Sequence, residues 1–299
     1  MRTIPALGHD IALQLEFLRT FKPQNPIGPR NVLFCGSGDS LVSSMMAECF
    51  SDYVARAIDP LDLVKNKNIS KNKHVYFVSI SGNTISNVRA AKITTKSTAI
   101  TKNDTSKLAK ICNGIIKLDY VDSNTLTSGS ISFLASMLTC ISLVKRLRLR
   151  KPSQLFKYAQ NQSKNIQLKN KIYYIGNQYT YPLCMYAAAK LHEVLGLDAH
   201  YERIEQFSHM GLFSAKRGDT IIIFEGKNQH NKQLVTNLKK LGLSVHNPSI
   251  KSNDMISQVI FYTFMSQLVA LNHAKTKRLV DCYFITEKKI RNVSSSMIY

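Results

Sequence analysis

The chain has 299 residues, 44% of them hydrophobic, which excludes a disordered protein and is enough for one large core or two cores of ordinary domain size. Lys and Arg total 40 against 19 Asp and Glu, and the net charge of +21 attracts anions from phosphorylated metabolites to nucleic acid. The basic residues are dispersed, and no aromatic residues alternate with them as a base-stacking platform requires, which argues against a nucleic-acid partner.

The sequence shows no motif of a targeting signal or of a metal site. No segment reaches eighteen uninterrupted apolar residues, and the first residues do not have the order of a signal peptide, so we expect no membrane association. The six cysteines are widely spaced without a C-x-x-C pair, which indicates buried thiols in a reducing compartment. We therefore expect a cytoplasmic protein that needs neither a cofactor nor a metal ion.

The first half of the chain alternates strands and helices after an N-terminal helix at about residues 9–21. Buried apolar runs predict strands at 31–36, 74–81, 97–101 and 114–120, and amphipathic or apolar runs predict helices at 40–56, 85–95 and 131–147. Such alternation implies parallel β-α-β units in a three-layer sandwich.

The second half repeats this order after a polar segment, residues 151–170, which we interpret as a linker. Strands are predicted at 171–178, 218–226 and 244–247, and helices at 181–196, 231–242 and 256–275. Both halves then read strand, glycine turn, helix, strand, glycine turn, helix, and a closing apolar helix. The predicted fold is α/β, with two tandem flavodoxin-like three-layer domains that arose by internal duplication.

A cluster of hydroxyl residues ends one strand of the first half. The sequence FVSISGNT places Ser79, Ser81 and Thr84 between an apolar run and a predicted helix. Uncharged hydroxyls donate hydrogen bonds, and the N-terminus of a helix favours an anion, so this loop suits a phosphate group. The alternative is an ordinary strand-to-helix turn in which Ser81 or Thr84 caps the helix.

Four motifs together resemble the sugar isomerase (SIS) family. They are CGSGDS at 35–40, SISGNT at 79–84, IGNQYTYPLCMYAAAKLHE at 175–193, and a histidine followed by MGLFS at 209–214. The likeness is greatest to the isomerase half of glucosamine-6-phosphate synthase, which has two SIS domains in tandem. The glutaminase half of that enzyme has no counterpart here, because Arg2 stands where its nucleophilic cysteine follows the initiator methionine.

The resemblance implies a division into domains and a set of phosphate contacts. Residues 1–150 form the first SIS domain with the N-terminal helix, 151–170 the linker, and 171–299 the second SIS domain with a C-terminal tail. The ligand is a phosphorylated sugar, and the residues expected to hold its phosphate are Ser37, Ser79, Ser81 and Thr84. Ser128 and Ser130, in NTLTSGS, are expected as further sugar contacts.

The catalytic residues implied by the resemblance are Glu193, Lys190 and His209. Aldose–ketose isomerisation passes through an enediol, and it needs a carboxylate that moves a proton between two carbons. Glu193 matches that base, and Lys190 lies three residues earlier on the same helix face, where an ammonium stabilises enediolate charge. Standing alone, a Lys and a Glu at this spacing would indicate a surface ion pair.

His209 follows the glutamate at the spacing of the family's ring-opening histidine. In the family this histidine enters the neighbouring subunit's site, so the resemblance implies a homodimer with a shared active site. Glu202 and Glu205 lie between the base and the histidine and are candidates to orient its ring.

Two positions depart from the synthase. Ser295 stands where the synthase tail has a lysine. It is expected as a sugar contact, because serine can hydrogen-bond a sugar hydroxyl, but it cannot form an imine or supply charge. Tyr186 stands where the synthase has a second glutamate. These departures argue against amination and leave an aldose–ketose isomerase of hexose or amino-hexose phosphates as the leading interpretation. The alternative is a non-catalytic sensor or regulatory subunit that binds a sugar phosphate.

Overall fold

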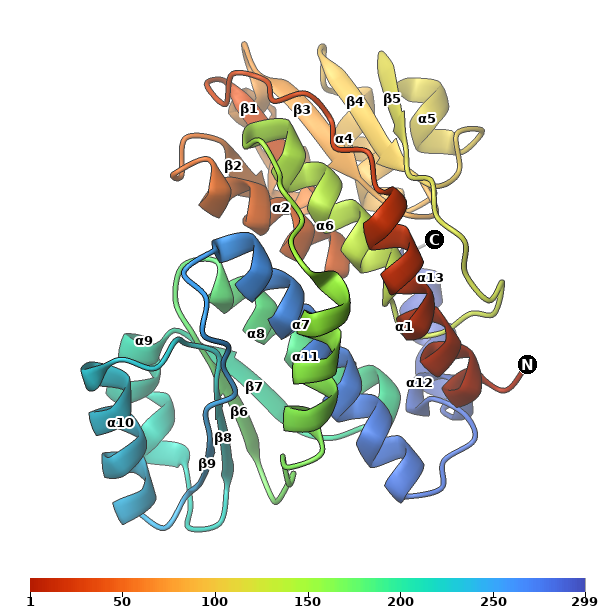
Figure 1. The fold of residues 1–299 in the computed structure, drawn as a ribbon. Helices are drawn as coiled ribbons and strands as arrows, with labels where there is room; N and C mark the ends of the chain where they lie inside the picture. Colours follow the sequence, from red (N-terminus) through yellow and green to blue (C-terminus); the bar gives the residue numbers. More distant parts are fainter. Residues whose placement is uncertain (299) are drawn as a thin grey trace. The chain divides into compact units, whose positions relative to one another are not determined.

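The computed structural model of the chain describes residues 1–298, which form two compact units with one parallel β-sheet each (Figure 1). The first-sheet unit comprises Thr20–Asp122, Gly129–Leu147 and the C-terminal residues from Glu287. The second-sheet unit comprises Met1–Arg19, Ser123–Ser128 and Arg148–Thr286. These units are defined by packing, and each is made of several separate stretches of the chain. The domain boundaries expected from the duplicated sequence pattern stay a prediction.

The sheet of the first unit has five parallel strands in the order β2-β1-β3-β4-β5. In chain order the strands are β1 (Val32–Cys35), β2 (Arg56–Ile58), β3 (His74–Val78), β4 (Ser97–Thr101) and β5 (Gly114–Lys117). All residues of β1 and β4 are buried, as expected of strands that are covered on both faces. This strand order is that of flavodoxin-like sheets.

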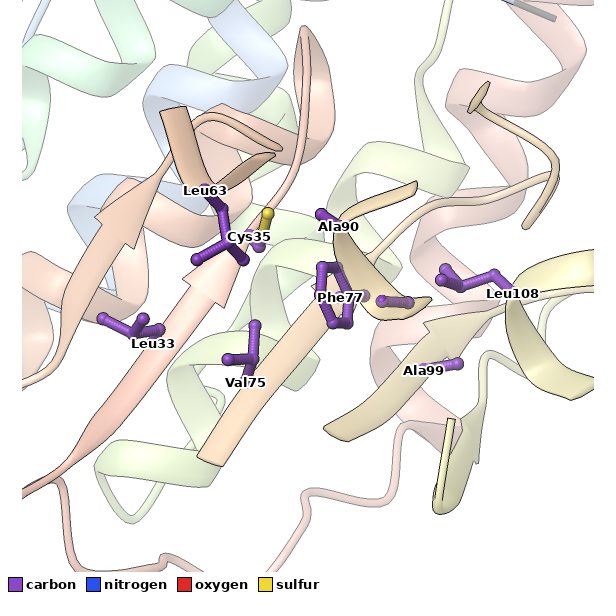
Figure 2. Close-up of a cluster of buried hydrophobic side chains, with 9 residues drawn as sticks. Leu33, Cys35, Leu63, Val75, Phe77, Ala90, Ala99 and Leu108 are labelled. Carbon is purple, nitrogen blue, oxygen red and sulfur yellow. The ribbon is translucent and has the colours of Figure 1, made fainter. Parts of the chain in front are cut away.

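Helices cover both faces of this sheet. The unit contains α2 (Asp39–Phe50), α3 (Pro60–Lys65), the 3-10 helix η1 (Lys67–Ser70), α4 (Ile85–Lys92), α5 (Lys107–Ile111), α6 (Ile131–Val144) and α13 (Lys288–Ile298). On one face, Leu33, Cys35, Val75, Phe77 and Ala99 of three strands pack against Leu63, Ala90 and Leu108 of α3, α4 and α5 (Figure 2). On the other face α2 contacts β1 and β3 and packs against α6. The unit is therefore a three-layer sandwich.

The second unit repeats the arrangement with four parallel strands in the order β7-β6-β8-β9. These are β6 (Ile172–Ile175), β7 (Ala199–Glu202), β8 (Thr220–Ile223) and β9 (Ser244–His246). Numbered within its own half, this order is the same as that of the first four strands of the other sheet. The predicted α/β fold with two parallel flavodoxin-like sheets is confirmed.

The helices of the second unit again form two layers. They are α1 (Thr3–Thr20), α7 (Pro152–Ser163), α8 (Thr180–Leu195), α9 (Ile204–His209), the 3-10 helix η2 (Gly211–Ser214), α10 (Gln229–Lys240), α11 (Met255–Thr276) and α12 (Tyr283–Thr286). Ile204 and Phe207 of α9 and Leu238 of α10 cover one face of the sheet. On the other face α8 contacts β6, and Tyr262 of α11 stacks on Phe224 at the end of β8.

Two segments differ from the sequence-based prediction. The N-terminal helix begins at Thr3 rather than near residue 9, which the chemistry allows because Pro5 lies in the first turn, where its missing N–H has no intrahelical partner. Residues 152–163 of the expected linker form α7, which has Pro152 at its first position and packs against α11 through buried Leu155 and Ala159. The polar composition of this segment reflects only the exposed face of the helix.

One helix within residues 1–298, α11, is long and apolar enough to cross a membrane. Of its most apolar stretch, 83% is buried inside the protein, and its neighbours are α7 and α8. A mostly buried core helix can have the same length and composition, and α11 is buried in this way.

Candidate active site

The hydroxyl loop of SISGNT follows β3, at the carboxyl edge of the first sheet. Ligands of open α/β sheets bind at this edge. The Ser79 side chain is buried, and those of Ser81 and Thr84 are half-buried. Ser79 Oγ lies 3.3 Å from Thr84 Oγ1 and accepts a hydrogen bond of 3.2 Å from the Gly82 amide. The structure thus brings the predicted hydroxyls together in one tight turn.

The loop is not a simple helix cap. Thr84 occupies the N-cap position of α4, but its side chain makes no capping hydrogen bond. Ser81 Oγ accepts from the Asn83 amide at 3.3 Å, which closes a turn before the helix begins. Side-chain capping by Thr84 or Ser81 is therefore absent among the described residues, and the first turn of α4 keeps its attraction for an anion.

Glycine at position 82 is required by two constraints. Its φ of +63° lies in the left-handed region, and an added Cβ would fall 2.0 Å from Ser106 Oγ. The loop is also fixed from β4, because Thr101 Oγ1 donates to the Ile80 carbonyl at 3.0 Å and the Lys102 amide donates to the same carbonyl at 3.2 Å. These contacts make the loop rigid before any ligand binds.

The other predicted binding residues of this unit lie on separate elements. Ser37 is half-buried in the loop between β1 and α2, and β1 is the neighbour of β3 in the sheet. Ser130 is buried at the N-cap of α6. Ser295 lies on α13 with an exposed side chain. No hydrogen bond is described between any of these three residues and the hydroxyls of the 79–84 loop.

In the second-sheet unit, Lys190 and Glu193 project from the last two turns of α8. Lys190 Nζ donates to Glu193 Oε2 at 2.7 Å. Ser128 Oγ donates to the same oxygen at 2.5 Å. Ser128, expected as a sugar contact, is thus a hydrogen-bond donor to the predicted base in this structure.

The exposure of the pair is asymmetric. The Lys190 side chain is 1% exposed, whereas that of Glu193 is 38% exposed. The pair is therefore not the surface ion pair that its spacing suggests, and the carboxylate is accessible to a ligand while the ammonium is not. Removing the carboxylate would leave a buried ammonium without this partner, which typically costs several kcal/mol.

The surroundings of Glu193 determine its protonation state. Burial acts to raise the pKa of Glu193, but the charge of Lys190 and the hydrogen bonds from Lys190 and Ser128 outweigh it and hold the pKa below its usual value. Glu193 is therefore ionised at neutral pH, as a general base must be. Because the pKa is lowered by folding, the pair stabilises the protein above the unfolded pKa, and that stability is lost as the pH falls through the folded pKa.

Three buried side chains in series, Tyr186, Gln267 and Gln14, lead away from Lys190. Lys190 Nζ lies 4.8 Å from the centre of the Tyr186 ring, in cation–π geometry. The Tyr186 hydroxyl accepts from Gln267 Nε2 at 3.0 Å, and Gln267 Oε1 accepts from Gln14 Nε2 at 2.7 Å. Tyr186, where the synthase has a glutamate, thus supports the ammonium by its ring face without adding a charge.

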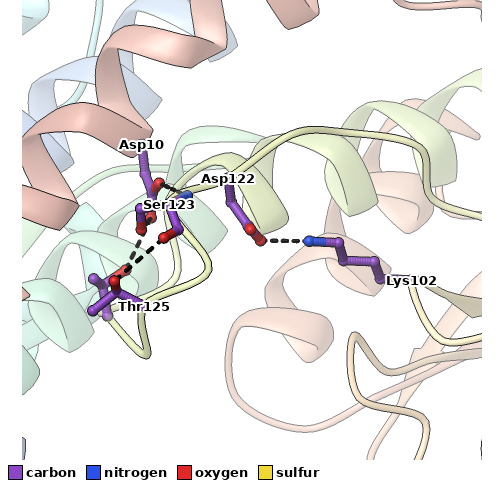
Figure 3. Close-up of polar contacts among 6 residues, drawn as sticks. Asp10, Lys102, Asp122, Ser123 and Thr125 are labelled. Atoms are coloured by element: carbon purple, nitrogen blue, oxygen red, sulfur yellow. Dashed lines mark hydrogen bonds and ion pairs between the residues drawn. The ribbon is translucent and has the colours of Figure 1, made fainter. Parts of the chain in front are cut away.

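Asp10 on α1 orders the segment that carries Ser128. Its carboxylate accepts from the Ser123 amide at 2.6 Å, from Ser123 Oγ at 3.1 Å and from Thr127 Oγ1 at 3.2 Å. Figure 3 shows Asp10 beside Ser123 and Thr125, and it also shows the 2.6 Å ion pair that Asp122 forms with Lys102 in the other unit. Asp10 is 4% exposed, so its three hydrogen bonds fix residues 123–128 within the second-sheet unit.

The predicted ring-opening histidine lies on the surface. His209 is the last residue of α9, its side chain is 71% exposed, and its Nε2 lies 3.3 Å from Glu205 Oε1. Glu202 instead faces the following turn, because an added Cβ on Gly211 would lie 2.3 Å from its Oε1. Of the two candidate orienting glutamates, the structure places Glu205 at the histidine. No hydrogen bond is described between His209 and Glu193.

Asp10 and Thr101 are the residues that the sequence did not indicate. Asp10 lies in the middle of a helix, and its partners follow more than a hundred positions later. From the sequence, Thr101 is expected only to be an ordinary β-branched residue of a strand. Neither has a local sequence signal, because the function of each depends on a contact between distant segments.

Comparisons with known proteins match part of the chain by sequence and most of it by fold. A sequence profile of the SIS domain matches residues 165–250, the stretch that contains Lys190, Glu193 and His209. No curated protein sequence matches the chain.

Solved structures of similar fold cover nearly the whole chain. Glucosamine-6-phosphate deaminase from Thermotoga maritima has a TM-score of 0.75 and 18% identity, with 93% of this chain and 95% of that chain covered. Tagatose-6-phosphate ketose/aldose isomerase from Escherichia coli has a TM-score of 0.66 and 15% identity, with 92% and 90% covered. The C-terminal domain of glucosamine-fructose-6-phosphate aminotransferase from Francisella tularensis has a TM-score of 0.63 and 13% identity, with 94% and 95% covered. At these identities the similarity shows the fold.

The role of Asp10 is tested by Asp10→Asn. An amide offers one acceptor oxygen instead of two, so the bonds to Ser123 and Thr127 weaken, and hydrogen bonds to charged groups contribute about 1.5–3 kcal/mol each. Hydrogen–deuterium exchange followed by mass spectrometry should show amides of residues 123–128 exchanging roughly ten- to a hundredfold faster.

Asp281→Asn is the matched control, because the Asp281 carboxylate also accepts from α1, at Thr3, and has no described hydrogen bond to residues 123–128. This control should leave exchange at 123–128 unchanged. Equal exchange of the segment in the wild type and Asp10→Asn would show that Asp10 does not order it.

Proposed function

We propose that the protein is an aldose–ketose isomerase of phosphorylated sugars, acting on a hexose phosphate or an amino-hexose phosphate. The observation that carries the proposal is Glu193, an ionised and partly exposed carboxylate held by a buried ammonium within the stretch that matches the SIS domain. The rigid hydroxyl loop before α4 supports a phosphorylated substrate, as does its agreement with the phosphate loop of the family. Phosphosugar isomerases among the similar structures support the same class of reaction.

In this mechanism Glu193 removes the carbon-bound proton next to the carbonyl and returns it to the neighbouring carbon, while the proton of the adjacent hydroxyl passes to the former carbonyl oxygen. Lys190 donates to the carboxylate from its buried position, and its positive charge acts on the developing enediolate across the carboxylate rather than by direct contact. Ser128 holds the same carboxylate oxygen, Oε2, so Oε1 is the oxygen that takes the proton. Ser37, Ser79, Ser81 and Thr84 bind the phosphate, and Ser130 and Ser295 contact the sugar.

We further propose a homodimer in which His209 opens the sugar ring in the partner's site. Its exposure and the absence of a described bond to Glu193 support a role outside its own subunit. The proposal includes two tandem SIS domains, residues 1–150 and 171–299, joined by 151–170, and a cytoplasmic location. No step requires a cofactor or a metal ion.

One observation favours the alternative of a non-catalytic sugar-phosphate sensor. Ser295 replaces the tail lysine of the synthase, and its exposed hydroxyl cannot supply charge or form an imine. This substitution removes amination chemistry, but proton transfer by Glu193 does not depend on it.

The proposed reaction is tested by proton exchange. In deuterated water, the protein should exchange the carbon-bound hydrogen next to the carbonyl of at least one of four substrates: glucose-, fructose-, mannose- or glucosamine-6-phosphate. Glu193→Gln should slow this exchange by at least about a hundredfold, since general bases contribute 10²–10⁴-fold. The measurement is ¹H NMR of the sugar over time.

The controls separate lost chemistry from lost folding. Glu193→Asp keeps a negative charge beside Lys190 but withdraws the carboxylate by one methylene, so it should fold and exchange slowly. Glu16→Gln makes the same change as Glu193→Gln at an exposed glutamate of α1, and it should exchange at the wild-type rate. Tight binding of a sugar phosphate by the wild type, with no exchange for any of the four sugars, would establish the sensor instead.

The shared active site is tested by subunit mixing. Glu193→Gln and His209→Ala homodimers should each be inactive, whereas a mixed dimer contains one site with both an intact glutamate and an intact histidine. Mixing should restore up to roughly a quarter of the wild-type activity, because half of the dimers are mixed and each has one intact site. Mixed dimers that stay inactive after mass spectrometry shows subunit exchange would contradict the shared site.

A further inference from the structure

The second sheet has its own counterpart of the hydroxyl loop. The hydroxyl loop joins β3 to α4, and the corresponding connection of the second sheet joins β8 to α10, because the two sheets have the same strand order. Both connections lie at carboxyl ends of parallel strands, where such folds bind ligands. The connection after β8 reads Phe224, Glu225, Gly226, Lys227, Asn228 and contains no hydroxyl residue.

A cavity of about 700 Å³ lies beside this connection. The connection lines one part of it, and the segment between β9 and α11 lines another. Its polar lining includes Lys227, Asn228, Ser249, Lys251, Ser252 and Asn253. The volume is in the range of pockets that hold small metabolites.

The charge of this cavity selects an anion. Lys227 and Lys251 are exposed, neither forms an ion pair within residues 1–298, and no acidic residue lines the cavity. The nearest acid in sequence, Glu225, is engaged elsewhere: its Oε1 accepts from the Asn177 amide and from Thr180 Oγ1, both at 2.9 Å. The N-terminus of α10, whose first turn has no acidic residue, adds positive potential.

The walls of the cavity are held in place before a ligand binds. The Ser249 backbone exchanges two hydrogen bonds with the Gln162 side chain, both at 3.0 Å. Gln258 Nε2 donates to the Ser252 carbonyl at 2.7 Å, and Gln258 Oε1 accepts from the Tyr179 hydroxyl at 2.9 Å. Preorganised walls reduce the entropy lost on binding.

More cations line a neighbouring cavity. A second cavity of about 370 Å³ shares Lys251 and Ser252 with the first and is also lined by Arg150 and Lys151. Its one acid, Asp254, caps α11 by accepting from the amide and the hydroxyl of Ser257. The two cavities therefore adjoin at Lys251, and cations line both of them.

We propose that the cavity beside the β8–α10 connection is a second anion-binding site, which takes the phosphoryl group of a small phosphorylated metabolite between Lys227 and Lys251. Lysine ammonium groups bind such a group as point charges, and Asn228 and Asn253 supply neutral donors. The site is formed entirely by the second-sheet unit. It requires neither the hydroxyl loop nor the isomerase reaction, so it stands or falls independently of the proposed function.

The test is isothermal titration calorimetry of the full chain with inorganic phosphate, glucosamine-6-phosphate and glucosamine. The wild type should bind one more phosphate per chain than the double variant Lys227→Gln/Lys251→Gln, whether or not the hydroxyl loop also binds. In a Ser81→Ala background, which weakens the hydroxyl loop, the double variant should lose at least about tenfold in affinity for the remaining phosphate. Glucosamine should not bind at this site, and tighter binding of glucosamine-6-phosphate than of phosphate would identify a sugar phosphate as its ligand.

Lys239→Gln/Lys240→Gln is the matched control, because it removes two exposed charges from the opposite end of α10, outside both cavities. It should keep the wild-type stoichiometry, with an affinity within about twofold of the wild type. All of these lysines are exposed, so the variants should fold. Equal losses in the two double variants, or an unchanged stoichiometry in Lys227→Gln/Lys251→Gln, would overturn the proposal.

Discussion

The buried ammonium of Lys190 is the constraint on which the second-sheet unit depends. A lysine that is 1% exposed has lost most of its hydration, and the protein compensates with the Glu193 carboxylate at 2.7 Å and the ring face of Tyr186. These contacts fix the rotamers of the last two turns of α8. The same contacts keep Glu193 ionised, so the interaction that stabilises the fold also keeps this carboxylate in the form that the proposed base requires.

Ser128 shows how a distant segment contributes to that interaction. It reaches Glu193 only because residues 123–128 pack with the second-sheet unit, although the chain on either side belongs to the other unit. Asp10 holds the 123–128 segment in this unit by three hydrogen bonds. The N-terminal helix therefore acts on the carboxylate through Asp10 and Ser128, and also through the chain of Gln14, Gln267 and Tyr186 that ends at Lys190.

The two units offer a substrate different types of interaction: neutral donors in the first-sheet unit and a charged pair in the second-sheet unit. The hydroxyl loop offers neutral donors and a helix N-terminus, which suit the phosphate of the proposed substrate without a compensating buried charge. The α8 site uses a charged pair in a partly buried setting, where a carboxylate retains its ionisation because the ammonium is fixed. Both positions follow from the parallel sheets, since each set of residues lies on or before a helix that follows a strand.

The sequence predicted the features that have a local pattern. Alternation of apolar runs with helical periodicity gave the two parallel sheets, and the cluster of Ser79, Ser81 and Thr84 indicated the loop that the structure closes around Gly82. The burial of Lys190 has no local sequence pattern. KLHE at 190–193 has the spacing of a surface ion pair, and only tertiary packing buries the lysine. Likewise the sequence of α7 reads as a linker, because only two of its three buried residues are apolar and they give a weak periodic signal among many polar ones.

The protonation of Glu193 in the free protein tests the central claim most directly. The carboxyl carbon of Glu193 is followed by ¹³C NMR in protein labelled at glutamate, and its signal is assigned by its loss in Glu193→Gln. The account predicts a titration midpoint below that of an ordinary glutamate, and a higher midpoint in Ser128→Ala, which removes one of the hydrogen bonds that favour the charged form. A midpoint at or above the ordinary value would mean that burial outweighs Lys190, and it would contradict the assignment of Glu193 as a base held ionised by the buried ammonium.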